Sequence, residues 1–207
     1  MITVNVTKKL RAYNGLQNLQ IDKKFAPGCI TRITGPSGAG KTTLLKMIAG
    51  LTDPDSGIIK AGEVWFDADK HVNYPPQQRR VGFVFQDYAL FPNMTVREHL
   101  AYASEDKAWI ARLLELGQLT AFADQKPLHL SGGQQQRLAI LRALAIKPQI
   151  LLMDEPFSAL DIRMKTGLIA NLQALFKELQ ATVLIVSHNP YELDGISDDE
   201  LVIGEEV

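Results

Sequence analysis

The hydrophobic positions of this chain follow two periods, and the changes of period predict strands and helices. Near the start, Ile2, Val4 and Val6 alternate with polar residues, as in a β-strand with one buried face. The turn-forming pair Asn14–Gly15 interrupts this pattern, so we expect antiparallel strands in the first thirty residues. Further short strands are predicted within residues 58–86.

The second half of the chain shows longer apolar runs and helical spacing. The runs 150–154 and 182–186 are apolar throughout, which is typical of strands buried in a parallel sheet. Glycines, prolines and capping residues punctuate the helical segments, with Thr95 before one helix, Gly50 and Gly117 after two others. We expect helices in residues 42–50, within 93–126, and over 134–146 and 161–180.

Composition narrows the class of protein. The chain has 207 residues, 46% of them hydrophobic, which is enough for one compact domain. Lys and Arg (22) nearly balance Asp and Glu (23), so no basic field favours nucleic acid or anionic lipid. The lone Cys29 excludes an intramolecular disulfide, and no apolar run has the length of a membrane span. We therefore expect a protein of a reducing compartment that reaches a membrane only through a partner.

The segment GPSGAGKT carries the clearest chemistry. Gly35, Gly40, Lys41 and Thr42 satisfy the pattern G-x-x-x-x-G-K-[ST], in which backbone N–H groups surround phosphates and the lysine reaches the outer ones. The loop follows a predicted strand and opens a predicted helix, whose N-terminal dipole favours an anion. An ordinary glycine turn is the weaker reading. Thr42 supplies a hydroxyl for Mg²⁺.

A pair of carboxylates ends the apolar run ILLMD. In a parallel sheet this edge forms the binding crevice, and we expect the pair on a strand neighbouring that of the phosphate loop. Asp154 would hold Mg²⁺, through water, and Glu155 would polarise the attacking water as general base. An acidic pair alone is more often a solvated turn, but the phosphate loop favours the functional interpretation.

The segment LSGGQQQR places two glycines at the start of a helix. It resembles a second anion site, yet the chain offers only one phosphate-loop lysine. A head-to-tail pair of chains would resolve this, with each ATP held by one subunit's loop and covered by Ser131, Gly132 and Gly133 of the other. An N-cap serine followed by glycines for close packing is the alternative.

With these motifs in order, the chain resembles the ATP-binding cassette (ABC) ATPases over nearly its whole length. The resembling segments are GPSGAGKT, VFQD, LSGGQQQR, ILLMDEP, SALD and IVSHN. The resemblance implies an α/β fold: a P-loop NTPase core with a mainly parallel sheet, an N-terminal antiparallel β-subdomain and a small helical subdomain. It implies one domain over 1–207, with residues 1–86 and 139–207 as nucleotide-binding core, 87–138 as helical subdomain and no C-terminal regulatory domain.

The resemblance also implies roles for single residues. Gln86 would sense Mg²⁺ and the attacking water, His188 would contact the terminal phosphate, and Asp161 would lie at the dimer interface. Tyr13 would stack on adenine, although a strand-end tyrosine without a ligand is its alternative, as a core histidine is for His188. The remaining nucleotide contacts implied are Ser37, Gly38, Ala39, Gly40, Lys41, Thr42 and Thr43, with Ser131, Gly132, Gly133 and Gln134 of the partner chain; the implied metal contacts are Thr42, Gln86 and Asp154.

Partners are implied in the same way. The apolar residues Tyr88, Leu90, Phe91 and Met94 either anchor the helical insert or border a groove for a transmembrane permease. The segments FQDYALFP and DEPFSALD resemble the corresponding segments of the ATPases of bacterial importers for oxyanions such as molybdate. We expect an ATP-dependent homodimer at the cytoplasmic membrane face, served indirectly by a solute-binding protein. Arg32 departs from the family's apolar strand and needs a carboxylate partner.

Three other functions are alternatives to uptake by an importer. A soluble ABC ATPase of translation or DNA repair usually has two cassettes or a coiled-coil insertion. A non-enzymatic nucleotide sensor should lack Glu155, which is present. An exporter or lipoprotein-release ATPase stays open within the transporters.

Overall fold

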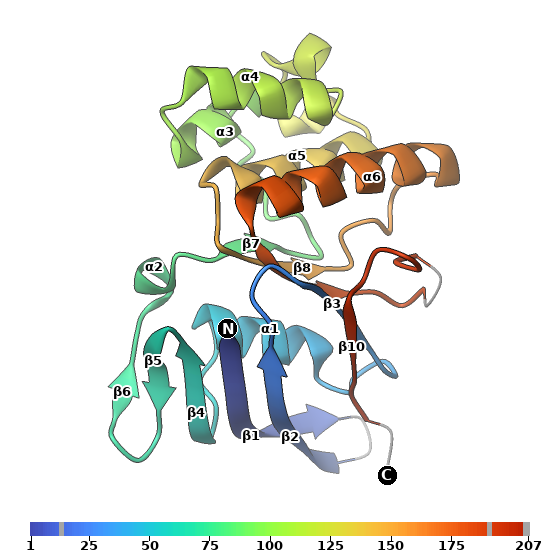
Figure 1. The fold of residues 1–207 in the computed structure, drawn as a ribbon. Helices are drawn as coiled ribbons and strands as arrows, with labels where there is room; N and C mark the ends of the chain where they lie inside the picture. Colours follow the sequence, from blue (N-terminus) through green and yellow to red (C-terminus); the bar gives the residue numbers. More distant parts are fainter. Residues whose placement is uncertain (13–14, 190–191, 205–207) are drawn as a thin grey trace.

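The computed structural model describes residues 1–12, 15–189 and 192–204. Figure 1 shows two sheets with helices packed around them: α5 and α6 cover one face of the parallel sheet, α1 lies on the other face, and α3 and α4 lie beyond α5. The helices are α1 (Lys41–Ala49), α2 (Pro76–Arg79), α3 (Val96–Ala103), α4 (Lys107–Leu116), α5 (Gly132–Ala145) and α6 (Ile162–Leu179), with 3₁₀ turns at Thr120–Phe122 and Pro127–His129.

The parallel sheet carries the site. Its order is β10-β3-β9-β8-β7, and every adjacent pair is parallel. The bounds are β3 (Ile30–Thr34), β7 (Gly82–Val84), β8 (Ile150–Asp154), β9 (Thr182–Val186) and β10 (Asp199–Val202). The predicted adjacency of the loop strand β3 and the acidic strand β8 is wrong, because β9 lies between them. Strand order is set by the crossover helices, which leave no local signal in either strand.

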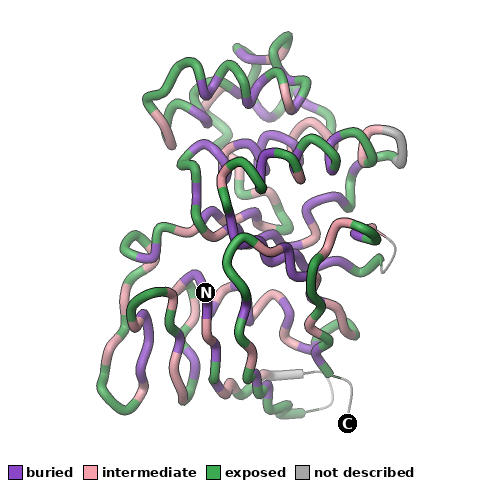
Figure 2. The backbone as a smooth tube through the Cα atoms, viewed as in Figure 1, coloured by how far each residue is buried: buried purple, intermediate pink, exposed green. Residues whose placement is uncertain are grey.

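Both faces of this sheet are buried, as the continuous apolar runs predict. Leu151 and Met153 of β8 face the cluster formed with α3, α5 and α6, whereas Leu152 faces the cluster formed with α1 and the second sheet. Figure 2 shows the same strands as buried between exposed outer loops. The alternation follows from the two-residue period of a strand, so each strand contributes to two cores.

The second sheet is antiparallel, in the order β2-β1-β4-β5-β6. Ile2, Val4 and Val6 are all buried, and the residues between them are less so, which confirms the predicted alternation. This sheet packs against α1 and so supports the start of that helix. Its strands are β1 (Ile2–Ala12), β2 (Gly15–Phe25), β4 (Ser56–Ala61), β5 (Glu63–Asp67) and β6 (Val72–Asn73).

Capping residues fix the helix ends at the expected places. Thr95 accepts from the Glu98 N–H and Glu98 accepts from the Thr95 N–H, a reciprocal cap at the start of α3. Gly50 ends α1 in the left-handed conformation that glycine tolerates best. Among the helices described here, none is long and apolar enough to cross a membrane.

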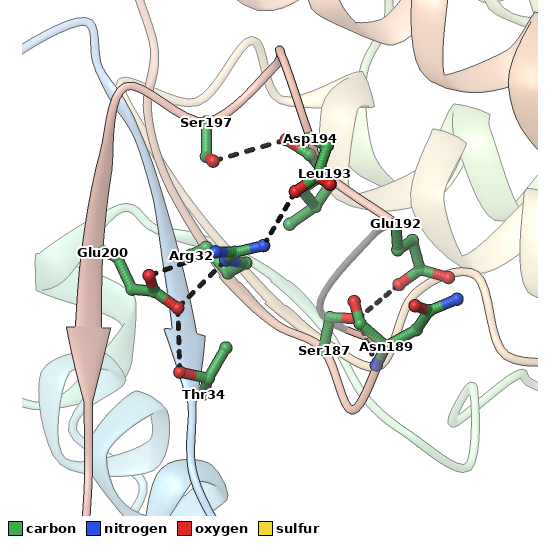
Figure 3. A network of polar contacts seen from close by, with 9 residues as sticks. All are labelled: Arg32, Thr34, Ser187, Asn189, Glu192, Leu193, Asp194, Ser197 and Glu200. Carbon is green, nitrogen blue, oxygen red and sulfur yellow. Dashed lines mark hydrogen bonds and ion pairs between the residues drawn. The ribbon is translucent and has the colours of Figure 1, made fainter.

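Arg32 has the partner that the sequence did not identify. Its guanidinium binds both carboxylate oxygens of Glu200 on β10, at 3.0 and 3.1 Å, and Asp194 at 3.2 Å (Figure 3). The Thr34 hydroxyl donates to the same Glu200 carboxylate at 3.0 Å. Since Arg32 and Glu200 lie side by side on parallel strands, the pair joins the edge strand β10 to the strand that leads into the glycine loop.

Candidate functional site

The loop between β3 and α1 needs its glycines for two different reasons. Gly35 has φ +137°, and a Cβ there would lie 2.0 Å from the Ile203 carbonyl oxygen. Gly40 has φ +100°, and its Cβ would meet side-chain carbons of Leu10 and Leu19 within 3 Å. Both positions therefore exclude side chains by backbone conformation and by space. Gly38, at φ +80°, is constrained by conformation alone.

Lys41 is folded back over this loop. Its Nζ donates to the carbonyl oxygens of Gly35 at 2.7 Å and Pro36 at 2.8 Å, and the residue is buried. Burial lowers the pKa of the Lys41 ammonium, while the carboxylates of Glu155 and Asp154 oppose that shift. The positive charge therefore lies at the mouth of the loop, held by weak neutral acceptors that a phosphate oxygen can replace.

A pocket of about 330 Å³ opens at the loop, a size that suits a small ligand. It joins the loop to the ends of three other segments that are distant in sequence, represented by Gln86, Glu155 and His188. The described residues that line it are Leu10, Ser37, Gly38, Gly40, Lys41, Thr42, Thr43, Gln86, Glu155 and His188.

Asp154 brings a buried carboxylate to the end of β8. The residue is only 2% exposed, and its Oδ1 has no hydrogen-bond partner within the described residues. Burial raises the pKa of Asp154, a hydrogen bond with Thr42 lowers it, and the Glu155 charge raises it. An orphaned buried carboxylate oxygen beside a threonine hydroxyl fits a hard cation such as Mg²⁺, which prefers oxygen ligands.

Glu155 and His188 meet across the sheet edge. The Nε2 of His188 lies 2.9 Å from the Oε1 of Glu155, with the Glu155 side chain 19% exposed and the His188 side chain 49% exposed. The Glu155 backbone is in the left-handed region at φ +49°, which is unfavourable for a residue with a Cβ. Its N–H donates to the Val186 carbonyl at 3.0 Å, which holds it at the end of β9.

The LSGGQ segment forms the start of α5. Ser131 is its N-cap, with Oγ accepting from the Gln134 N–H at 3.3 Å and the Ser131 N–H donating to the Gln134 side chain at 2.8 Å. A Cβ on Gly133 would press on Leu160 at 3.2 Å, whereas a Cβ on Gly132 would have nothing within 4 Å among the described residues. Close packing within the chain therefore accounts for Gly133 and leaves Gly132 unexplained.

Gln136 contributes to the site although sequence reasoning gave it no role. Its side-chain amide donates to the Glu155 carbonyl and to Ser158 Oγ, both at 3.2 Å, and accepts from the Ala159 N–H at 3.0 Å. The residue is 1% exposed. In the sequence Gln136 lies in the polar first half of this helix, beside Gln135 and Arg137, so no local pattern singles it out. Its burial makes it structural, because a buried amide must find partners.

The remaining predicted residues are placed as follows. Asp161 is exposed and caps α6 by accepting from the Met164 N–H at 2.9 Å. Neither Asp161 nor Ser131, Gly132 and Gly133 line the pocket. Ala39, for which a nucleotide contact was expected, is also absent from that lining and is buried. Tyr13 falls outside the described residues.

The aromatic loop after Gln86 is partly packed against the helices and partly exposed. Tyr88 and Leu90 pack against the helical core. Arg142 of α5 donates to the Tyr88 and Ala89 carbonyls, at 2.9 and 2.6 Å, and fixes the loop. Phe91 is 39% exposed, and the centroid of its ring lies 5.5 Å from the ring centroid of the exposed Tyr102. The loop thus anchors the helical segment and still presents an aromatic surface.

A phosphate loop at the carboxyl edge of a parallel sheet, facing a lysine and paired carboxylates, defines a P-loop NTPase fold. The chain belongs to the ABC transporter family, whose family model matches residues 18–158.

Similar proteins of known identity include two import subunits. The sulfate/thiosulfate import ATP-binding protein CysA of Gloeobacter violaceus is 40% identical over 207 residues, which cover 96% of this chain and 58% of that protein. The molybdenum import ATP-binding protein ModC of Shewanella oneidensis is 40% identical over 205 residues, 98% of this chain and 56% of that one. The chain thus spans less than two thirds of the length of each.

Two solved structures share the fold closely. A dimeric bacterial ABC transporter cassette has a TM-score of 0.82 and 32% sequence identity, with 98% of this chain and 94% of that chain covered. A second structure, described as a dimeric post-hydrolysis state of an ATP-binding cassette bound to ADP and Pi, has a TM-score of 0.83 and 31% identity at the same coverage.

Proposed function

We propose that this chain is the ATP-hydrolysing subunit of an ABC importer for a small oxyanion. The observation that carries the proposal is the contact of Glu155 with His188 in a pocket that also holds Lys41 and Thr42. The similarity to CysA and ModC supports uptake of an oxyanion, with sulfate or thiosulfate and molybdate as the two solutes to compare.

In the proposed mechanism the chain's residues bind, orient and activate. Backbone N–H groups of residues 37–43 and the Lys41 ammonium hold the phosphates of ATP, replacing the carbonyl contacts of Lys41. Glu155 accepts the proton of the attacking water, and His188 orients Glu155 and contacts the terminal phosphate. Thr42, Gln86 and Asp154 would hold Mg²⁺, which when bound neutralises developing phosphate charge.

The proposal extends to assembly and partners. Ser131 and Gly132 do not line the chain's own pocket, and a Cβ on Gly132 would meet no described atom within 4 Å. They would instead cover the nucleotide of a second copy, with Asp161 in the shared interface. Closure by ATP and reopening after hydrolysis would drive a membrane permease that contacts the exposed Phe91 and Tyr102 surface. Such a subunit works at the cytoplasmic membrane face.

Phosphate release from ATP by the purified chain tests the proposed chemistry. Glu155→Gln should lower kcat by about 10²–10⁴, the usual contribution of a general base, and retain ATP binding. Lys41→Ala should weaken ATP binding itself, because the loop loses its only ammonium. Calorimetric titration of ATP separates the two effects. Hydrolysis by Glu155→Gln at the wild-type rate would remove the general-base assignment.

Uptake in a gene-deleted strain tests the solute. The strain is complemented with the wild-type gene or with Glu155→Gln, and uptake of labelled sulfate and molybdate is measured in parallel. Restored uptake of either anion by the wild type alone supports an oxyanion importer and identifies the solute. Unchanged uptake of both anions in the deleted strain would contradict it.

A further inference from the structure

A second polar cluster lies beside the Glu155–His188 pair. It consists of Ser187 at the end of β9, Lys165 in the first turn of α6, and Glu192 in the loop after His188. A space of about 220 Å³ separates this cluster from Glu155 and has Ser158 and Asn189 on its wall. On this side His188 therefore borders a polar space rather than close apolar packing.

Glu192 is the centre of the cluster. Its Oε1 accepts from Lys165 Nζ at 2.6 Å and its Oε2 accepts from the Ser187 hydroxyl at 2.6 Å (Figure 3 shows the Ser187 contact). Its side chain is 6% exposed and that of Lys165 is 21% exposed. A carboxylate this buried is stable only while a cation compensates it, so the pair holds a defined geometry.

The cluster brackets His188 in the chain. The Asn189 N–H donates to the Ser187 hydroxyl oxygen at 3.1 Å, so a hydrogen bond links the two residues that flank His188 in the chain. Through Glu192, this turn is fixed to Lys165. The backbone N–H of Lys165 donates to the Asp161 carbonyl at 2.9 Å, so Lys165 lies one helical turn after Asp161.

We propose that Lys165 and Glu192 are positioning residues, which hold His188 against Glu155 and tie it to the start of α6. A displacement of Asp161 and the first turn of α6 is then transmitted to His188 through one ion pair and one hydroxyl. This proposal rests on the proposed function for its effect on hydrolysis, but the position of His188 is a property of the chain without nucleotide.

Hydrolysis kinetics provide the first measurement. Lys165→Met and Glu192→Gln should each lower kcat by about 10- to 100-fold with KM within about twofold, the size typical of residues that orient a functional group. Lys165→Arg keeps the charge and should restore kcat to within about threefold. The control is Arg112→Met, which breaks an ion pair between α4 and Glu178 of α6 that is half exposed on both sides. Equal kcat values for Lys165→Met and Arg112→Met would overturn the proposal.

The histidine imidazole NMR spectrum of the nucleotide-free protein provides a second, activity-independent measurement. The chain has four histidines, and His188→Gln assigns the signal in question. Lys165→Met should move the His188 signal and leave those of His71, His99 and His129 in place. An unmoved His188 signal overturns the positioning role. A wild type that binds ATP without hydrolysing it would contradict the proposed function alone. Glu192→Gln, which keeps the side-chain size, carries the same tests should Lys165→Met fail to fold.

Discussion

Asp154 illustrates at the scale of one residue how a binding site opposes stability. Burial raises its pKa above the ordinary value of 3.8, so this carboxyl is protonated more readily in the folded chain than in the unfolded chain. Between the ordinary and the raised pKa the folded state binds more protons than the unfolded state. Stability from this group is therefore highest at low pH and decreases as pH rises through that interval. At neutral pH the ionised Asp154 destabilises the nucleotide-free protein.

Asp154→Asn should accordingly raise the Tm of the nucleotide-free protein at pH 7. A gain of about 1 kcal/mol, the scale of one unsatisfied buried polar atom, corresponds to about 2–4 °C in a domain of this size. The same variant should lose the additional stabilisation that ATP gives in the presence of Mg²⁺. Thermal unfolding with and without the nucleotide measures both effects.

Asp67→Asn is the matched control for that measurement. Asp67 is also buried, at 6% exposure, but its Oδ1 accepts from the backbone N–H groups of Asp69 and Lys70. Its replacement should lower the Tm, because those donors lose a charged acceptor. A fall in Tm for Asp154→Asn as well would contradict the destabilising role of Asp154.

Arg32 and Glu200 act at the scale of elements, because they join two parallel strands. The hydrogen bond from Arg32 lowers the pKa of Glu200 below its ordinary value of 4.5. The folded state therefore binds fewer protons than the unfolded state between the two pKa values. This contribution to stability is present above pH 4.5 and is lost as pH falls through the lowered pKa.

Glu200→Gln should lower the free energy of unfolding at pH 7 by about 1 kcal/mol or less, since the pair is partly exposed to solvent. The difference from wild type should shrink as pH falls from 4.5 through the lowered pKa, because Glu200 is protonated in both states only below that value. Urea unfolding over pH 3.5–7.5 measures it. Asp124→Asn, which removes a largely exposed partner of Arg97, is the control and should change nothing. A pH-independent difference would contradict the linkage to Arg32.

At the scale of the whole molecule, Ser131, Gly132 and Gly133 do not line the pocket of their own chain, and the proposed dimer would bring them to the site of a second copy. Glu155→Gln with ATP should shift from monomer to dimer in light scattering after gel filtration, because a nucleotide that is bound without turnover holds the interface closed. The same variant without ATP should stay monomeric. Adding Ser131→Arg should abolish the shift while ATP binding persists. A persistent monomer in Glu155→Gln would mean that closure requires the permease, or that Ser131 does not cover the partner's nucleotide.

Local chemistry determined much of what the sequence predicted. Gly50, Thr95 and Gly117 end or begin helices through contacts with residues three or four positions away, and the apolar runs of β8 and β9 require burial on both faces. The phosphate loop is likewise contiguous in the sequence, although Leu10, Leu19 and Ile203 also limit its space from distant parts of the chain. For such features the interacting residues are close together in the sequence, so the sequence alone is enough to predict them.

Tertiary structure decided which distant residues meet. Four features join segments about 20 to 170 positions apart in the sequence. They are the strand order that places β9 between β3 and β8, the ion pairs of Arg32, the hydrogen bond from Gln136 to Glu155, and the link from Lys165 through Glu192 to His188. Such contacts arise because a buried charge or amide must find a partner wherever packing brings one. The sequence by itself determined that these groups needed partners, and only the packing of strands and helices determined which ones they found.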